Sequence, residues 1–284
     1  MNQEKIIQLK QGLSTAFINQ NNSSNLAYRP QFVSNNYKEG RKVISSIEDE
    51  LLACEEFFIS VAFITMGGIT PLLQTLRELE QRNIPGKILT TDYLTFSDPK
   101  ALRILENFKN IELKMFVTQN EKEGFHTKGY IFKKEEMYRI IVGSSNMTLS
   151  ALTTNREWNT KIVSTEQGEY TQNVVAEFNQ LWNAKQSLPF EAFIEVYTDI
   201  YTKNKIIQKQ KELAKQAEMP SLEVYRLQPN SMQVGFINNL RKIYEAGEDK
   251  ALLISATGAY VILKAGEKSL FYKGLEPVFS IMRE

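Results

Sequence analysis

The chain has 284 residues, more than one ordinary domain of about 100–200, so its length favours one large domain with a smaller unit attached. With 42% apolar and 24% charged residues, it is neither disordered nor collagen-like. Thirty-four basic and 33 acidic residues give a net charge of +1, which excludes a strongly cationic surface but not a local basic groove.

No segment has the pattern of a membrane span or an export signal. The longest apolar runs, Phe57–Ile64 and Ala251–Ile254, fall far short of the about 20 residues that a span needs. Met1–Lys10 lacks the apolar centre of a signal peptide. We therefore expect a soluble, cytoplasmic protein with no membrane partner.

Cys54 is the only cysteine, which excludes an internal disulfide and any all-cysteine metal site. A reducing, cytoplasmic setting fits this usage. Cys54 lies among the apolar residues of Ile47–Phe58, so we predict a buried core residue rather than a nucleophile.

The order of the elements indicates an α/β fold. Residues 1–38 are rich in Asn, Gln and Ser and predict a helix followed by an extended arm. The pattern then predicts a helix over Arg41–Glu55, a strand over Phe57–Thr65, a helix over Ile69–Gln81, a strand over Lys87–Thr91, a helix over Pro99–Phe108 and a strand over Ile111–Val117. Such alternation is typical of a mixed, mostly parallel sheet flanked by helices.

Beyond Gly124 the predicted strands follow one another more closely. They cover Phe125–Phe132, Met137–Val142 and Glu157–Val163, and a long amphipathic helix follows at Gly168–Lys185. We expect an N-terminal helix and arm over 1–38, the main domain over 39–186, a helical linker over 187–220 and a small C-terminal α/β appendage over 221–284. The linker carries a run of lysines, which favours a solvated face over a nucleic-acid contact.

The only histidine, His126, lies in the strand pattern Phe125–Phe132. Side chains alternate along an extended strand, so His126 and Lys128 are expected to project from the same face. A lone histidine is more often structural than functional. Pairing with a lysine, an anion-binding turn and a carboxylate favours a functional site instead.

That turn is Gly143–Asn146, with the sequence Gly-Ser-Ser-Asn between a strand and the short apolar stretch Met147–Leu152. Its N–H groups and hydroxyls can surround an anion, although an ordinary helix N-cap is the alternative. Glu157 follows eleven residues after Asn146 and supplies the carboxylate.

Together, His126-Thr127-Lys128 and Gly143-Ser144-Ser145-Asn146 resemble the signature of the phospholipase D superfamily, His-x-Lys followed by Gly-Ser-x-Asn. The resemblance covers roughly residues 40–185 and implies a phospholipase D-like catalytic domain. Members of the superfamily often have an aspartate five residues after the lysine, where this chain has Lys133. The difference points towards the branch resembling restriction nucleases, in which a glutamate, matched here by Glu157, takes the supporting role.

These residue types suit phosphodiester cleavage. Neutral His126 is a nucleophile for phosphorus, through a phosphohistidine that water then hydrolyses. The expected ligands of the non-bridging oxygens are Lys128, Asn146 and the hydroxyl of Ser144 or Ser145. Glu157 is expected to accept the other imidazole N–H. No cluster of acidic residues in the sequence resembles a two-metal site, so we expect no cofactor and a metal-independent reaction.

A single copy of the motif leaves the leaving group without a proton donor. The superfamily obtains that proton from a second histidine in a duplicated motif, whereas His126 is the sole histidine here. We therefore expect a homodimer with one shared site.

The C-terminal part carries a second resemblance. Leu227–Gln233, a helix and Ala251–Gly258 resemble the opening of a superfamily 2 helicase, in which a glutamine reads adenine and a strand enters the phosphate loop. That loop needs Gly-Lys-Ser/Thr after the Thr-Gly dipeptide, and this chain has Tyr260, Val261 and Ile262 there. We expect a truncated or divergent helicase start without ATP hydrolysis of its own, with a chance resemblance as the alternative.

The sequence thus predicts a metal-independent phosphodiesterase acting on nucleic acid, most plausibly DNA, in a restriction or defence system with a helicase partner or a missing motor domain. The alternative is a non-catalytic DNA-binding or targeting module of a helicase. A lipid hydrolase ranks third, because of Lys133 and the absent duplication.

Overall fold

The computed structural model describes residues 2–118 and 124–218, together with 235, 238–239, 241–242, 245–246, 261–265 and 268–272. The chain divides into two compact units, residues 1–212 and 213–284. Within the described residues, no helix is both long enough and apolar enough to cross a membrane.

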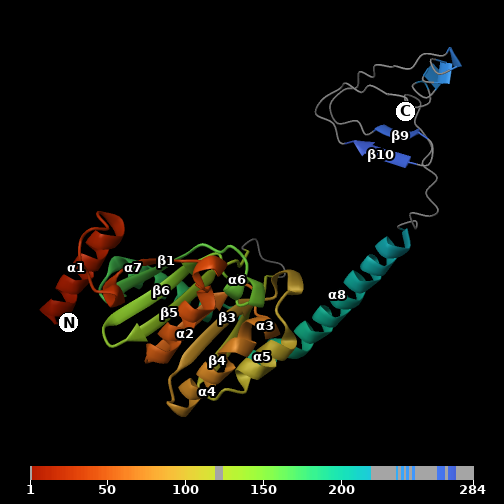
Figure 1. Ribbon diagram of the computed structural model, residues 1–284. Helices are drawn as coiled ribbons and strands as arrows, with labels where there is room; N and C mark the ends of the chain where they lie inside the picture. The colour runs from red at the N-terminus through yellow and green to blue at the C-terminus, as the bar shows by residue number, and fades with distance from the viewer. Residues whose placement is uncertain are drawn as a thin grey trace. The chain divides into compact units, whose positions relative to one another are not determined.

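The first unit is built from helices around one eight-stranded sheet (Figure 1). The helices are α1 (Gln3–Phe17), α2 (Val43–Ala53), α3 (Met66–Ile69), α4 (Leu73–Gln81), α5 (Pro99–Glu106), α6 (Leu149–Thr153), α7 (Glu169–Asn183) and α8 (Phe190–Glu218). The strands are β1 (Gln31–Val33), β2 (Glu56–Val61), β3 (Gly86–Thr91), β4 (Ile111–Phe116), β5 (Lys128–Lys134), β6 (Met137–Gly143), β7 (Asn159–Thr165) and β8 (Ser187–Pro189). Their order across the sheet is β1-β7-β6-β5-β2-β3-β4-β8.

The mixed α/β sheet flanked by helices confirms the predicted fold class, but the prediction that parallel pairs dominate is wrong. Only β2 with β3 and β3 with β4 run parallel, whereas the other five neighbouring pairs are antiparallel. For β5 and β6 the cause is the tight turn at residues 135–136, because so short a connection joins only antiparallel strands. The helical crossovers that make parallel pairs are confined to residues 56–116.

The two faces of the sheet bury separate apolar clusters. Phe57 and Ile59 of β2 pack in one cluster, and Phe58 between them packs in the other, as strand alternation requires. Helices α2, α4, α5 and the start of α8 supply buried side chains to the first cluster, and α7 supplies Phe178 and Trp182 to the second. The sheet is therefore covered on both faces.

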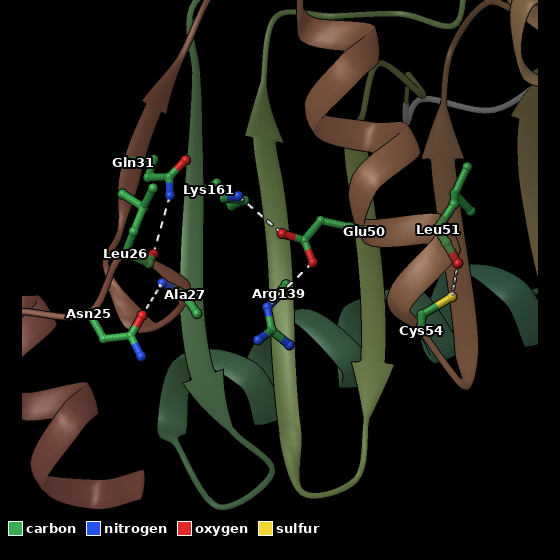
Figure 2. A network of polar contacts seen from close by, with 9 residues as sticks. All are labelled: Asn25, Leu26, Ala27, Gln31, Glu50, Leu51, Cys54, Arg139 and Lys161. Carbon is green, nitrogen blue, oxygen red and sulfur yellow. Dashed lines mark hydrogen bonds and ion pairs between the residues drawn. The ribbon is translucent and has the colours of Figure 1, made fainter.

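A half-buried ion cluster fastens α2 to the sheet (Figure 2). The Glu50 carboxylate of α2 lies 3.3 Å from Nε of Arg139 on β6 and 3.0 Å from Nζ of Lys161 on β7. At the end of α2, the Cys54 thiol donates to the carbonyl of Leu51 at 3.1 Å, and burial raises the pKa of Cys54 to about 11. The prediction of a buried Cys54 is confirmed.

The N-terminal arm joins the sheet. Asn25 accepts a hydrogen bond from the amide of Ala27 at 3.0 Å, which begins the turn that leads into β1 (Figure 2). Strand β1 then pairs with β7, with Val33 opposite Asn159. The arm thus reaches the strand that begins just after Glu157.

In the second unit, β9 (Val261–Ala265) and β10 (Lys268–Tyr272) form an antiparallel pair. Val261 and Ile262, where a phosphate loop would lead into a helix, therefore lie in a strand. The helicase-like segments Leu227–Gln233 and Ala251–Gly258 lie outside the described residues.

Candidate active site

The candidate residues gather at one end of the sheet because of strand direction. Val61, at the end of β2, pairs with Lys128, at the start of β5. On the other side of β5, the end of β6 pairs through Gly143 with Asn159, at the start of β7. Strand ends from four segments that are distant in sequence therefore meet at a common edge.

His126 and Lys128 are in direct contact, as the spacing predicts. The Lys128 ammonium nitrogen lies 2.7 Å from Nδ1 and 3.1 Å from Nε2 of His126, and it donates to the His126 carbonyl at 2.9 Å. The imidazole is exposed, and Lys128 is half-buried. Strand β5 begins only at Lys128, so His126 lies in the segment that precedes it.

The electrostatics favour a neutral imidazole. Partial burial, and then the adjacent Lys128 cation, lower the pKa of His126 from its usual 6.5. Partial burial also lowers the pKa of Lys128, which the Glu157 carboxylate opposes. Glu157 therefore lies close enough to Lys128 for its charge to be felt there.

The Gly-Ser-Ser-Asn turn has an obligatory glycine and a buried serine. A Cβ on Gly143 would lie 2.2 Å from the carbonyl oxygen of Trp158, so only glycine permits this approach of the two strands. Ser145 has no exposed surface, and its hydroxyl accepts a hydrogen bond from Nδ2 of Asn159 at 3.0 Å. Of the two predicted serines, Ser144 is therefore the exposed one, and Ser145 holds the turn.

Glu157 contacts Ser144 rather than His126. The Ser144 hydroxyl donates a short hydrogen bond to the Glu157 carboxylate and accepts one from the Trp158 amide at 3.1 Å. The predicted hydrogen bond from the imidazole to Glu157 is absent from the described part of the chain, because the 144–157 contact engages this carboxylate instead.

Asn146 is oriented with its amide NH2 available. Its Oδ1 accepts from the backbone amide of Phe63 at 3.2 Å, and since that amide can only donate, the contacting atom is the oxygen. The neighbouring Met147 amide donates to the Phe63 carbonyl at 3.0 Å, which fixes the turn to the segment after β2. Asn146 can therefore present N–H donors to an anion.

The sequence analysis missed an aromatic group around His126. The ring centroids of Phe63 and Tyr93 lie 6.0 and 6.3 Å from that of the imidazole, both nearly perpendicular to it. Phe96 packs on Phe63 at 5.1 Å. A signal was present, because Tyr93 and Phe96 follow β3, and neighbouring parallel strands end at the same edge of a sheet.

In the described ranges, no group of three or more His, Cys, Asp or Glu side chains is arranged to hold a metal ion. The cationic and N–H-bearing groups of the site are Lys128 and Asn146, with the hydroxyl of Ser144 beside them. This donor set suits the oxygens of a phosphate ester.

Comparisons with known proteins agree with the resemblance seen in the sequence. Residues 50–182 match the family described as "Cardiolipin synthase, PLD-like domain". No match is found among the curated proteins. This match agrees with the predicted phospholipase D-like domain over the matched residues.

Solved structures with a similar fold include two proteins matched over almost their whole length and one matched over about a third. NucT from Helicobacter pylori is 13% identical, with a TM-score of 0.45 over 57% of this chain and 99% of its own. The phospholipase D family member Nuc from Salmonella typhimurium is 16% identical, with a TM-score of 0.43 over 57% and 98%. Yeast tyrosyl-DNA phosphodiesterase is 13% identical, with a TM-score of 0.36 over 54% and 37%.

Proposed function

We propose that this chain, which carries a phospholipase D-like domain over residues 50–182, hydrolyses phosphodiesters of nucleic acid, with His126 as the nucleophile. The observation that carries the proposal is the contact between the exposed His126 imidazole and the Lys128 ammonium, with Asn146 held through its Oδ1 so that its NH2 is left to donate. DNA is the expected polymer.

In the first step, a ring nitrogen of His126 attacks phosphorus, and the bond from phosphorus to the leaving oxygen breaks. In the structure, the Lys128 ammonium contacts the imidazole nitrogens. A bound phosphate must therefore attract this ammonium to a non-bridging oxygen, which frees the lone pair of the ring nitrogen. Lys128 and Asn146 then hold the charge on these oxygens in the transition state without a metal ion.

In the second step, water attacks the phosphohistidine and regenerates the imidazole, releasing a phosphate monoester. Protonation of the leaving oxygen needs an acid, and we assign it to His126 of a second copy, whose ring must carry a proton when the substrate is bound and then takes one back from the attacking water. The reaction is then balanced with water as the only co-substrate.

An uncovered apolar patch supports a second copy at this edge. Phe32 of β1 and Val142 of β6 are both exposed and both lie opposite Thr160 of β7 in the sheet register. Trp158 is 73% exposed and packs edge-on against Phe32 at 5.7 Å. The patch adjoins the Ser144 turn, where a two-fold partner would have to approach to share the site.

Glu157 takes a modified role in this proposal. Its hydrogen bond from Ser144 orients that hydroxyl, and its negative charge opposes the fall in the pKa of Lys128. Glu157 therefore acts as a positioning residue that keeps Lys128 cationic. The restriction or defence setting, the helicase partner and the cytoplasmic location remain parts of the proposal that rest on the sequence alone.

The deciding experiment incubates plasmid and single-stranded DNA with wild type and His126→Ala in excess EDTA. We expect cleavage by wild type and none by His126→Ala. A brief reaction followed by alkaline denaturation should also trap labelled phosphate on the wild-type chain, since a phosphohistidine survives base and is lost in acid. DNA binding without cleavage by wild type would favour the non-catalytic targeting module, and equal cleavage by His126→Ala would overturn the assignment.

A further inference from the structure

We infer that the rings of Phe63, Tyr93 and Phe96 form a base-stacking surface beside His126, and that this surface selects single-stranded nucleic acid as the substrate. The inference rests on the proposed function and names the substrate class of that same site. Its basis is two exposed rings, Tyr93 and Phe96, beside the half-buried ring of Phe63, none of which belongs to the buried apolar clusters of the core.

The three rings lie where the nucleotide next to a scissile phosphate would be placed. Phe63 and Tyr93 both present their rings nearly perpendicular to the imidazole, at interplanar angles of 73° and 79°. Tyr93 is 41% exposed and Phe96 52% exposed, although both are large apolar side chains. A base one nucleotide away from phosphorus lies within the reach of such rings.

The segment that carries Tyr93 and Phe96 is held in a strained conformation. Leu94 and Thr95 have positive φ angles of 55° and 51°, which non-glycine residues rarely adopt. Such strain persists only where the surroundings impose it, and it clusters at binding sites.

Hydrogen bonds from several elements impose this conformation. The buried side-chain carboxylate of Asp92 accepts hydrogen bonds from both the amide and the hydroxyl of Thr118 at 2.8 Å. The backbone carbonyl of Asp92 accepts one from the Thr95 amide at 2.9 Å. Nδ2 of Asn204, on α8, donates to the Thr95 hydroxyl at 2.7 Å. The rings are therefore presented by a fixed loop, which lowers the entropy cost of binding.

The ring faces favour single strands over duplex. Base faces in a duplex are covered by their neighbours, so an exposed protein ring gains stacking only from an unstacked base. Stacking requires no particular base, because every base has a π-face.

Helix α8 offers cations beside the same loop. The contact of Asn204 with Thr95 places this turn of the helix against the ring-bearing segment, and the Lys205 ammonium lies 4.7 Å from the ring centroid of Tyr201. The exposed lysines of this part of the helix are Lys203, Lys205, Lys209 and Lys211. These lysines add positive charge to the helix that contacts the ring-bearing segment, and such charge attracts the phosphates of a bound strand.

The test measures binding apart from catalysis. Fluorescence anisotropy measures binding to three labelled ligands: a 12-nucleotide single strand, its duplex, and the same strand with abasic central positions. The protein is full-length His126→Asn, alone and combined with Tyr93→Leu or Phe96→Leu. The matched control is Tyr170→Leu, because Tyr170 is also 41% exposed but begins α7, beyond the far end of β7. Circular dichroism checks folding of each variant.

The single strand is expected to bind at least fivefold more tightly than the duplex. Each ring variant should weaken this binding by roughly 5- to 100-fold, the effect of losing one stacked base, and should not alter binding of the abasic strand. Tyr170→Leu should change nothing. Equal binding of duplex and single strand, no effect of the ring variants, or preference for phosphatidylglycerol vesicles over the oligonucleotide would overturn the inference.

The two proposals fail differently. If wild type cleaves DNA while the ring variants bind and cleave as it does, the stacking surface is wrong and the proposed function stands. If wild type cleaves nothing while the ring and strand preferences hold, recognition stands and the catalytic assignment fails.

Discussion

The Lys128 ammonium lies 2.7 Å from Nδ1 of His126, so a cation and an imidazole touch across a spacing of two residues at the start of β5. The ring nitrogen that accepts from an ammonium must be unprotonated. Partial burial adds to this effect, because it disfavours a second positive charge. The contact therefore favours the unprotonated imidazole before substrate arrives, and the bound phosphate then draws the ammonium away.

This contact predicts a low titration midpoint for His126. Because it is the only histidine, its ring signals in a 1H–13C NMR spectrum need no assignment. The midpoint should fall below 6.5, the usual value, so the neutral form and the acid limb of activity extend to lower pH. Lys128→Met should raise the midpoint, and Lys134→Met, at the other end of β5, should not. A wild-type midpoint above 6.5 would contradict the assignment.

Loss of single site residues should affect turnover in a graded way. His126→Ala should abolish cleavage, and Lys128→Ala and Asn146→Ala should each lower kcat by about 10²–10³-fold, the usual loss for one transition-state donor. Folding should change little, since His126 is exposed and the other two are only half-buried. Single-turnover assays measure these rates. More than a few per cent activity in His126→Ala, or losses under tenfold in the other two, would refute the roles.

The sequence was sufficient for the local part of this site and insufficient for the rest. The spacing of two residues predicts that His126 and Lys128 share one face, and the two side chains do meet, although β5 begins only at Lys128 and His126 precedes it. The partner of Glu157, by contrast, depends on how β6 and β7 align, and in that alignment Ser144 comes within hydrogen-bond reach of Glu157.

In the fold, too, the sequence predicts the local features and not those that depend on distant parts of the chain. Helix and strand positions follow local periodicity, so α2, β3, α5 and α7 lie close to their predicted ranges. Strand direction depends on connections and pairing. The two-residue turn after Lys134 makes β5 and β6 antiparallel, and the pairs of β5 with β2 and of β6 with β7 are also antiparallel, where we expected a mostly parallel sheet. The ring cluster was missed because Phe63, Tyr93 and His126 meet only in the folded chain.

A shared site makes activity depend on the pairing of copies. Wild type and His126→Ala are mixed in equal amounts under conditions that exchange subunits, and cleavage is measured per total protein. If each reaction uses His126 of both copies, only dimers of two wild-type chains are active, so activity should fall to about one quarter. Independent sites would give about one half. Sedimentation of the wild type as an active monomer would also exclude the shared site.

Asn159 is expected to hold the Gly-Ser-Ser-Asn turn in place. It is 2% exposed, its Oδ1 accepts from the Ser145 amide at 3.3 Å, and its Nδ2 donates to the Ser145 hydroxyl at 3.0 Å and to the Val33 carbonyl at 3.2 Å. Asn159→Ala leaves these buried groups unpaired, which should cost about 2–3 kcal/mol in the free energy of unfolding. In a unit of this size, the thermal midpoint should fall by about 5–10 °C.

The same substitution should also lower activity, because Ser144 and Asn146 flank the residue that Asn159 fixes. The expected effect is on kcat more than on KM, since a displaced donor costs more in the transition state than in binding. Asn155→Ala is the matched control, as Asn155 is exposed and forms its hydrogen bonds through its backbone: the carbonyl accepts from Asn35 at 2.7 Å, and the amide donates to the Ser150 carbonyl at 2.7 Å. Differential scanning calorimetry and steady-state kinetics at a temperature well below both midpoints separate stability from catalysis. If Asn159→Ala melts and turns over like Asn155→Ala, the turn is held by its strands alone, and Asn159 has no positioning role.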